Sequence, residues 1–372
     1  MKKIILIITV LFTVNIIAQD SKKNSTKDTI EVKKDKGLPL KAERKININT
    51  DEGTWMSLDI SPDGKTIVFD MLGDLYLLPI EGGNAKRITE GLAFDSNPKF
   101  SPDGEDLLFV SDRTGGPNVW IINLATKDST QVTKGDTYNI QAAEWTPDGN
   151  YIISSRGNRN VKLNMHHRDG GKGTILIKTP ANLKTVEPAF GKDERYIWYS
   201  KRTGSWQYNA KFPQYQLAKY DRETGKSKTM TSRYGSAFSP TLSSNGKWLV
   251  YGTRWNDKTG LIARELKTGS EKWLAYPIQK DDQESQATLG VLPAMTFTPD
   301  SQNLLTSYGG KIYSIPIDGG DAKNIAFNVN EDIELGPRLK FNYPIEDKDY
   351  VTANHIRNPK LSPNGRMVAY SA

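Results

Sequence analysis

The chain contains no cysteine, so disulfide bonds, thiolate metal sites and a lipid-modified cysteine are all excluded. Histidine is nearly as scarce: His166, His167 and His355 are the only three. No H-E-x-x-H or H-x-H spacing occurs, so the sequence specifies no zinc site. Because neighbouring strand residues point to opposite faces, we interpret the adjacent His166 and His167 as structural or surface imidazoles. We therefore expect no metal and no cofactor in this chain.

The common catalytic motifs are also missing. Neither a G-x-S-x-G elbow nor a G-x-x-x-x-G-K-[ST] phosphate loop is present. Ser244 and Lys247 have the spacing of an S-x-x-K motif, but they lie in a turn rather than at the start of a helix. The sequence therefore predicts no catalytic residue.

The excess of positive charge is local. The formal net charge is +7, and Lys2, Lys3 and residues 20–45 account for six of these charges. The remaining residues are close to neutral and lack the concentrated basic face of a nucleic-acid-binding protein. Nucleic acid is thus excluded as a partner.

The N-terminal residues show the succession of charged, apolar and small residues that is typical of a secretory signal peptide. Lys2 and Lys3 precede the apolar run IILIITVLFTV, and Ala18 is followed by polar sequence. We predict a signal peptide over 1–18 and a charged flexible tether over 19–45, with an uncleaved membrane anchor as the alternative. The mature protein is then periplasmic or secreted from a Gram-negative bacterium, without stable membrane insertion.

A tetrapeptide turn recurs throughout the remaining residues, 46–372. Its copies begin at residues 61, 101, 146, 191, 243, 298 and 362, at intervals of 40, 45, 45, 52, 55 and 64. The first copies read Ser-Pro-Asp-Gly or Thr-Pro-Asp-Gly, and the fourth, Gly191-Lys192-Asp193-Glu194, is the most divergent. A period in the forties is typical of one four-stranded propeller blade.

The turn residues explain the local structure. Proline presets the second position of a type I turn, Asp or Asn bonds locally at the third, and Gly accepts a left-handed conformation. We therefore interpret Asp63, Asp103, Asp148 and Asp300 as architectural. Strand-like runs flank each copy, and six of the seven are followed by a second hairpin, such as 75–89 and 312–326. The predicted fold class is all-β, a propeller of four-stranded blades with about seven repeats.

Counting the strands predicts how the ring closes. The seventh copy of the turn forms a hairpin that ends with residues 366–372. No second hairpin follows it in the given sequence. Residues 43–50 resemble an unpaired outer strand. We expect this strand to pair with the last blade, which remains incomplete and leaves an exposed edge unless the native chain continues past Ala372.

Two groups of residues are candidates for binding. Asp95, Asp112 and Arg113 lie at strand ends, where an ion pair bracing neighbouring turns is favoured over a binding site. The long insert 201–216 is rich in aromatic side chains. It is either a recognition loop or packs on the adjoining blade. Its candidate recognition residues are Trp206, Tyr208, Phe212 and Tyr215.

On these repeats the chain resembles the TolB-like, WD40-like propellers of exported bacterial proteins. Residues 52–104 and 204–225 are most similar to the N-terminal propeller region of periplasmic amidohydrolases, in which the repeats precede a metal-dependent hydrolase barrel. Peptidases of the prolyl-oligopeptidase and tricorn types use similar blades. TolB itself has an α/β domain before its propeller, for which residues 19–45 are too few and too charged.

The resemblance implies a non-catalytic scaffold or substrate-gating region of a larger amidohydrolase. Its partner is then its own downstream catalytic domain, where a divalent metal such as zinc is expected. No catalytic residue of that family matches a residue of this chain. The alternatives are a stand-alone periplasmic protein-interaction module of TolB type and the propeller of a peptidase.

Overall fold

The repeated tetrapeptides form hairpin turns in the computed structural model, which describes residues 41–204, 213–280, 291–338, 343 and 347–372. In the first copy, the Gly64 amide donates to the Ser61 carbonyl at 2.8 Å, and Gly64 has a φ of +74°. The Ser61 hydroxyl donates to Asp63 at 2.6 Å, and the Lys65 amide donates to the same carboxylate oxygen at 3.1 Å. These bonds hold the pKa of Asp63 below its usual value. The turn carboxylates are therefore architectural, as interpreted.

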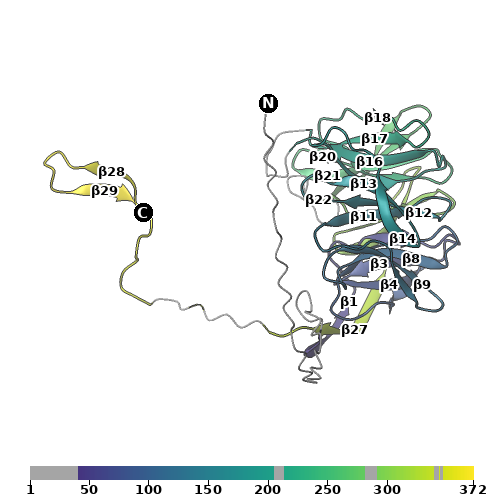
Figure 1. Cartoon of the computed structure of the whole chain (residues 1–372), viewed down its shortest axis with the longest axis horizontal. Coiled ribbons are helices and arrows are strands. Elements are labelled where there is room, and N and C mark those ends of the chain that lie inside the picture. The colour runs from purple at the N-terminus through teal and green to yellow at the C-terminus, as the bar shows by residue number, and fades with distance from the viewer. Residues whose placement is uncertain (1–40, 205–212, 281–290, 339–342, 344–346) are drawn as a thin grey trace, which may run out of the picture. The chain divides into compact units, whose positions relative to one another are not determined.

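Each turn joins the first two strands of a sheet, and the described residues contain six antiparallel four-stranded sheets, here called blades 1 to 6 (Figure 1). Blades 1 to 3 comprise β2 (Leu58–Ile60), β3 (Thr66–Met71), β4 (Asp74–Pro79) and β6 (Lys86–Arg87); β7 (Asp95–Phe100), β8 (Asp106–Ser111), β9 (Asn118–Asn123) and β10 (Ser129–Gln131); and β11 (Ile140–Trp145), β12 (Tyr151–Arg156), β13 (Lys162–His167) and β14 (Gly170–Ile175). Blades 4 to 6 comprise β15 (Lys184–Ala189), β16 (Tyr196–Arg202), β17 (Gln216–Asp221) and β18 (Ser227–Thr229); β19 (Phe238–Leu242), β20 (Trp248–Trp255), β21 (Lys258–Glu265) and β22 (Glu271–Lys280); and β23 (Thr296–Phe297), β24 (Asn303–Tyr308), β25 (Lys311–Pro316) and β26 (Lys323–Ile325).

The blades close into a ring. The first strand of each blade contacts the preceding blade, and β2 of blade 1 contacts β23 and β24 of blade 6 in the same way. The repeated turns of neighbouring blades also lie against one another around the ring. A Cβ atom added to Gly104 would lie 3.2 Å from Pro62 of the preceding turn, and one added to Gly64 would lie 3.5 Å from Pro299. The all-β propeller fold is confirmed, and its ring contains six blades among the described residues.

The expected mode of closure is wrong. The seventh copy of the turn does form a two-stranded sheet, β28 (Arg357–Leu361) and β29 (Val368–Ser371), without outer strands. However, residues 43–50 do not pair with it. Blades 6 and 1 already share a buried core containing Met56, Leu305 and Ile312, so no space for a further blade exists between them.

A separate three-stranded sheet fastens the two ends of the ring. β1 (Arg44–Thr50) pairs antiparallel with β27 (Phe327–Leu335) over its whole length, and β27 pairs in parallel with β5 (Gly83–Asn84) of the blade 1 hairpin. We call this sheet the clasp. β1 starts at Arg44, so the last two residues of the predicted tether, Arg44 and Lys45, belong to the clasp. Phe327 and Val329 are buried in the core shared by blades 6 and 1.

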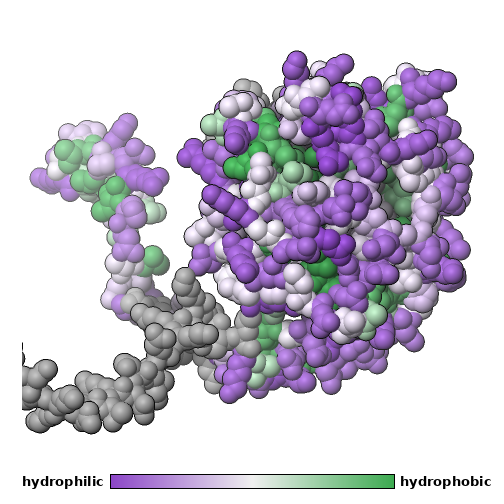
Figure 2. All heavy atoms as spheres, turned by 45° about the vertical axis from the view of Figure 1, so that its right-hand side comes forward, coloured by the Kyte–Doolittle hydropathy of each residue, from purple (hydrophilic) through white to green (hydrophobic). Residues whose placement is uncertain are grey.

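The side chains that hold neighbouring blades together are mainly apolar, and each interface between blades contains a buried apolar cluster. On the face of the propeller shown in Figure 2, hydrophilic side chains cover most of the surface and hydrophobic ones gather in small patches. In the part of the chain that the structure describes, no helix has the length and apolar character needed to cross a membrane.

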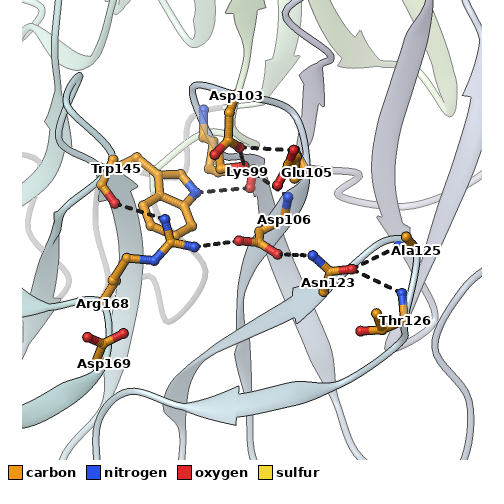
Figure 3. A network of polar contacts seen from close by, with 12 residues as sticks. Lys99, Asp103, Glu105, Asp106, Asn123, Ala125, Thr126, Trp145, Arg168 and Asp169 are labelled. Atoms are coloured by element: carbon orange, nitrogen blue, oxygen red, sulfur yellow. Dashed lines mark hydrogen bonds and ion pairs between the residues drawn. The ribbon is translucent and has the colours of Figure 1, made fainter.

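Blades 2 and 3 are additionally braced by the polar network drawn in Figure 3. Arg168, which follows β13, donates to Asp106 of β8, and Asn123 of β9 donates to the same carboxylate at 2.8 Å. The Arg168 guanidinium also lies over the Trp145 ring, 5.2 Å from its centroid. Asp106 is buried, so these contacts compensate the carboxylate for its loss of water.

Candidate functional site: the central cavity

The first strands of the six blades surround a cavity of about 220 Å³. Residues four and two positions before each repeated turn supply most of its polar lining. The residues at the position four before the turn, in chain order, are Ser57, Asn97, Ala142, Glu187, Ser239 and Ala294, and all except Ser57 line the cavity. The residues two before the turn are Asp59, Lys99, Glu144, Ala189, Thr241 and Thr296, and all of them line it.

The first of these positions is conformationally unusual. Asn97, Glu187 and Ser239 each precede a proline and have φ values of 52° to 55°. The pairing of the first two strands shifts register at each of these residues, as in a β-bulge. A left-handed conformation is costly for a residue other than glycine, and such residues cluster at functional or strongly constrained sites. Here the surrounding hydrogen bonds supply the constraint.

Glu187 ties three blades together. One oxygen of its carboxylate accepts from the Val291 amide at 2.7 Å and the Ser239 hydroxyl at 2.9 Å. The other accepts from the Ser239 amide at 2.8 Å and the Ser200 hydroxyl at 2.7 Å. Glu187 and Ser200 belong to blade 4, Ser239 belongs to blade 5, and Val291 lies in the segment that enters blade 6. With both oxygens fully used, this carboxylate has a structural role.

The carboxylate of Asp70 joins blades 1 and 2 through hydrogen bonds in a similar way. Its two oxygens accept from the amides of Ser57 and Asn97, both at 2.7 Å. The network continues to blade 6, because the Ala294 amide donates to the Ser57 hydroxyl at 3.1 Å. Burial raises the pKa of Asp70 to about 7, against the opposing effect of the two amides.

Two residues before the turn, blades 1 to 3 place charged side chains in the lining and blades 4 to 6 place uncharged ones. Lys99 lies 3.4 Å from Glu144, and their side chains are 13% and 23% exposed. Burial raises the pKa of Glu144, and the positive charge of Lys99 partly opposes this effect. Burial lowers the pKa of Lys99, but the negative charges of Glu144 and Asp59 outweigh burial, so the pKa of Lys99 lies above its ordinary value. The uncharged residues at this position are Ala189, Thr241 and Thr296. Such a cavity can hold a small polar group, and no histidine lines it.

The residues singled out by sequence do not converge on this cavity. Tyr215 is buried and packs against Phe238, with its ring centroid 5.3 Å from the Arg202 guanidinium. For this residue, packing on the adjoining blade is the correct alternative. Trp206, Tyr208 and Phe212 lie outside the described residues, and a recognition role for their loop stays a prediction.

The other candidates are structural. One terminal nitrogen of Arg113 donates to both oxygens of buried Asp95, at 2.9 and 2.7 Å, and Asp112 accepts from the Phe94 amide at 2.8 Å, so these residues brace turns as expected. His166 is buried and His167 is exposed. Ser244 contacts Ser301 at 2.9 Å, which joins the turns of blades 5 and 6. The described residues contain no group of three or more metal-ligating side chains.

Sequence reasoning missed the cavity lining and the clasp. A signal for the lining was present, because Asn97, Glu187, Ser239 and Asn358 all stand before proline, four residues ahead of a turn. A signal for β27 was the alternation of Phe327, Val329, Ile333 and Leu335 with polar residues.

Comparison with known proteins agrees with this architecture. Residues 38–208 match the TolB β-propeller domain family. The solved structure of a TolB-type protein from Agrobacterium tumefaciens superposes with a TM-score of 0.55 at 17% identity, covering 70% of this chain and 90% of that one. The chain has the fold of a TolB-like β-propeller.

Three relatives are each 28% identical to this propeller over part of its length. They are tricorn protease homolog 1 of Streptomyces coelicolor, dipeptidyl-peptidase 5 of Porphyromonas gingivalis and the Tol-Pal system protein TolB of Wolinella succinogenes. The matches cover 32%, 36% and 42% of this chain but only 12%, 22% and 39% of the relatives. The matched part of the chain therefore spans less than half the length of each relative.

Proposed function

We propose that this TolB-like propeller is a non-catalytic recognition scaffold of an exported protein, which docks a protein partner and gates the access of substrates to a hydrolase domain. The observation that carries the proposal is the central cavity. Its walls are fixed by bonds such as those of Glu187 and Asp70, and its charged groups, Lys99 and Glu144, can bind a polar group of a partner or substrate.

The hydrolase attached to the propeller is the finer part of the proposal. Our first candidate is a metal-dependent amidohydrolase domain, which rests on the resemblance of residues 52–104 and 204–225. A peptidase domain is the second candidate, favoured by the names of two relatives, tricorn protease homolog 1 and dipeptidyl-peptidase 5. A stand-alone interaction module, docking a periplasmic protein, is supported by the TolB relative.

The test uses the native gene product purified from its host. Hydrolysis of amide and peptide substrates of increasing size is measured with and without a metal chelator and a serine-reactive inhibitor. Loss of activity with the chelator supports the amidohydrolase, and loss with the inhibitor supports the peptidase. A product that hydrolyses nothing but cross-links specifically to an envelope protein supports the stand-alone module.

Gating is tested with an Ala189→Trp variant, which narrows the cavity. We expect hydrolysis of large substrates to fall at least tenfold while the smallest substrate is cleaved normally. The matched control is Ala125→Trp, on an exposed hairpin of blade 2. Equal size dependence in the two variants contradicts a gating role for the cavity.

A further inference from the structure

A second hollow lies between blades 2 and 3, away from the central cavity. It is a groove of about 830 Å³, which is within the range of small-molecule sites. Its walls come from the end of blade 2, the connection between the blades, and the outer strands of blade 3. Gly170, Gly171 and Gly173 form part of one wall. We call this hollow the interblade groove.

Beside the groove, blade 3 lacks large apolar side chains at positions where blades 1 and 2 have them. At one cross-strand position, blade 1 pairs Phe69 with Tyr76 and blade 2 pairs Phe109 with Trp120. The corresponding pair in blade 3 is Ser154 and Asn164. At the next cross-strand position on the same face, nearer to the repeated turn, the third strands of blades 1 and 2 carry Leu78 and Ile122. The third strand of blade 3 carries His166 there. A polar face therefore replaces an apolar one.

Buried polar groups on this face lack hydrogen-bond partners in the part of the chain that the structure describes. Ser154 is fully buried and His166 is 1% exposed. Neither the Ser154 hydroxyl nor either ring nitrogen of His166 has a hydrogen-bond partner among the described residues. Buried polar groups are rarely left unsatisfied without a reason, such as a bound molecule. His166 packs under Gly173, which lines the groove.

The charge of the groove is strongly positive. Four cationic residues line it, against one carboxylate, Asp169. The four are Lys134, Arg156, Lys162 and Lys172. None of them forms an ion pair with a carboxylate in the described ranges. The Lys162 ammonium donates to the Leu183 and Pro180 carbonyls, and Arg156 stacks on the Tyr138 ring at 4.4 Å. Burial, followed by the nearby charge of Arg156, lowers the pKa of His166 to about 4, so this imidazole adds no charge of its own.

We propose that the interblade groove binds a small multivalent oxyanion, an organic molecule carrying two or more carboxylate or phosphate groups. Arg156, Lys134 and Lys172 supply charge-assisted hydrogen bonds to the oxyanions. Asn160 and Gln131, which also line the groove, can bond its neutral polar groups. This site is independent of the proposed scaffold function.

Isothermal titration calorimetry on the full mature chain tests the proposal, with tripolyphosphate and citrate as probes and acetate as a univalent comparison. We expect saturable binding of at least one multivalent probe, weakening as salt is added, and no measurable binding of acetate. The two probes distinguish phosphate from carboxylate ligands.

The decisive variant is Lys134→Gln/Arg156→Gln/Lys172→Gln. Its control, Lys226→Gln/Lys228→Gln/Lys267→Gln, removes the same charge from exposed lysines outside the groove. We expect at least tenfold weaker binding for the groove variant and unchanged binding for the control. The double variant Lys134→Gln/Lys172→Gln changes only exposed side chains and replaces the triple variant if that one unfolds.

Nuclear magnetic resonance locates the ligand. The ring signals of His166, assigned with a His166→Gln variant, should shift on saturation with the probe, while those of His355 should not. Equal affinity of the groove and control variants, or an unshifted His166 signal, overturns the proposal.

Discussion

Replacing Glu187 with glutamine tests the idea that one buried carboxylate holds three blades in register. Its two oxygens accept four hydrogen bonds at 2.7 to 2.9 Å, two from backbone amides and two from hydroxyls. Glutamine has nearly the same shape but carries one oxygen and one NH₂ group. Each carboxylate oxygen accepts from one backbone amide, so either orientation of the new side chain points NH₂ at an amide donor.

The cost follows from these contacts. One buried amide loses its acceptor, which costs about 1–3 kcal/mol. The hydroxyl beside the new NH₂ can rotate to accept from it, and the two bonds to the remaining oxygen lose their charge assistance, at about 1 kcal/mol each. We therefore expect Glu187→Gln to lower the free energy of unfolding by about 3–5 kcal/mol.

Equilibrium unfolding in urea, followed by tryptophan fluorescence and far-ultraviolet circular dichroism, measures this difference. Glu81→Gln, at an exposed hairpin position of blade 1, is the matched control and should stay within about 0.5 kcal/mol of the wild type. The same small change for Glu187→Gln would refute the argument that this carboxylate ties the blades together.

Two further outcomes follow from other residues. Burial raises the pKa of Asp70 to about 7, so the native state retains a proton that the unfolded state loses above pH ~4. The free energy of unfolding of the wild type, relative to that of Asp70→Asn, should therefore fall by up to about 4 kcal/mol as the pH rises from about 4 to about 7, and should then level off. Urea titrations of both proteins across this pH range measure the difference. A difference that does not change with pH contradicts this prediction. In the turns, Gly104→Ala places a Cβ 3.2 Å from Pro62 at a φ of +78°, whereas Gly149→Ala meets Pro102 at an ordinary 3.6 Å. Both should cost about 1 kcal/mol in backbone strain, and calorimetric melting should show the larger loss for Gly104→Ala.

The blades were predictable because their determinants are local. Each Ser-Pro-Asp-Gly turn is specified by four adjacent residues, and each hairpin by the alternation on either side of it. Even the divergent copy at Gly191 was located correctly, because Asp193 still accepts from the Arg195 amide at 3.0 Å.

The closure of the ring was not predictable in this way. It depends on contacts between residues about 250 positions apart, such as the Ser307 hydroxyl donating to the Met56 carbonyl at 2.6 Å. A seventh turn in the sequence therefore suggested a seventh blade in the ring. The cavity was missed for a similar reason, since Glu187 acquires its role only when Ser239 and Val291 reach it from other blades.

The clasp gives the propeller a direction of mechanical weakness. Arg44 pairs with Leu335, so the chain enters β1 and leaves β27 at the same end of their ladder. Tension applied between the flanking segments would peel the two strands apart one residue pair at a time, instead of loading every bond at once. The ring can therefore open under a smaller force than would be needed to shear all the pairs of the ladder together.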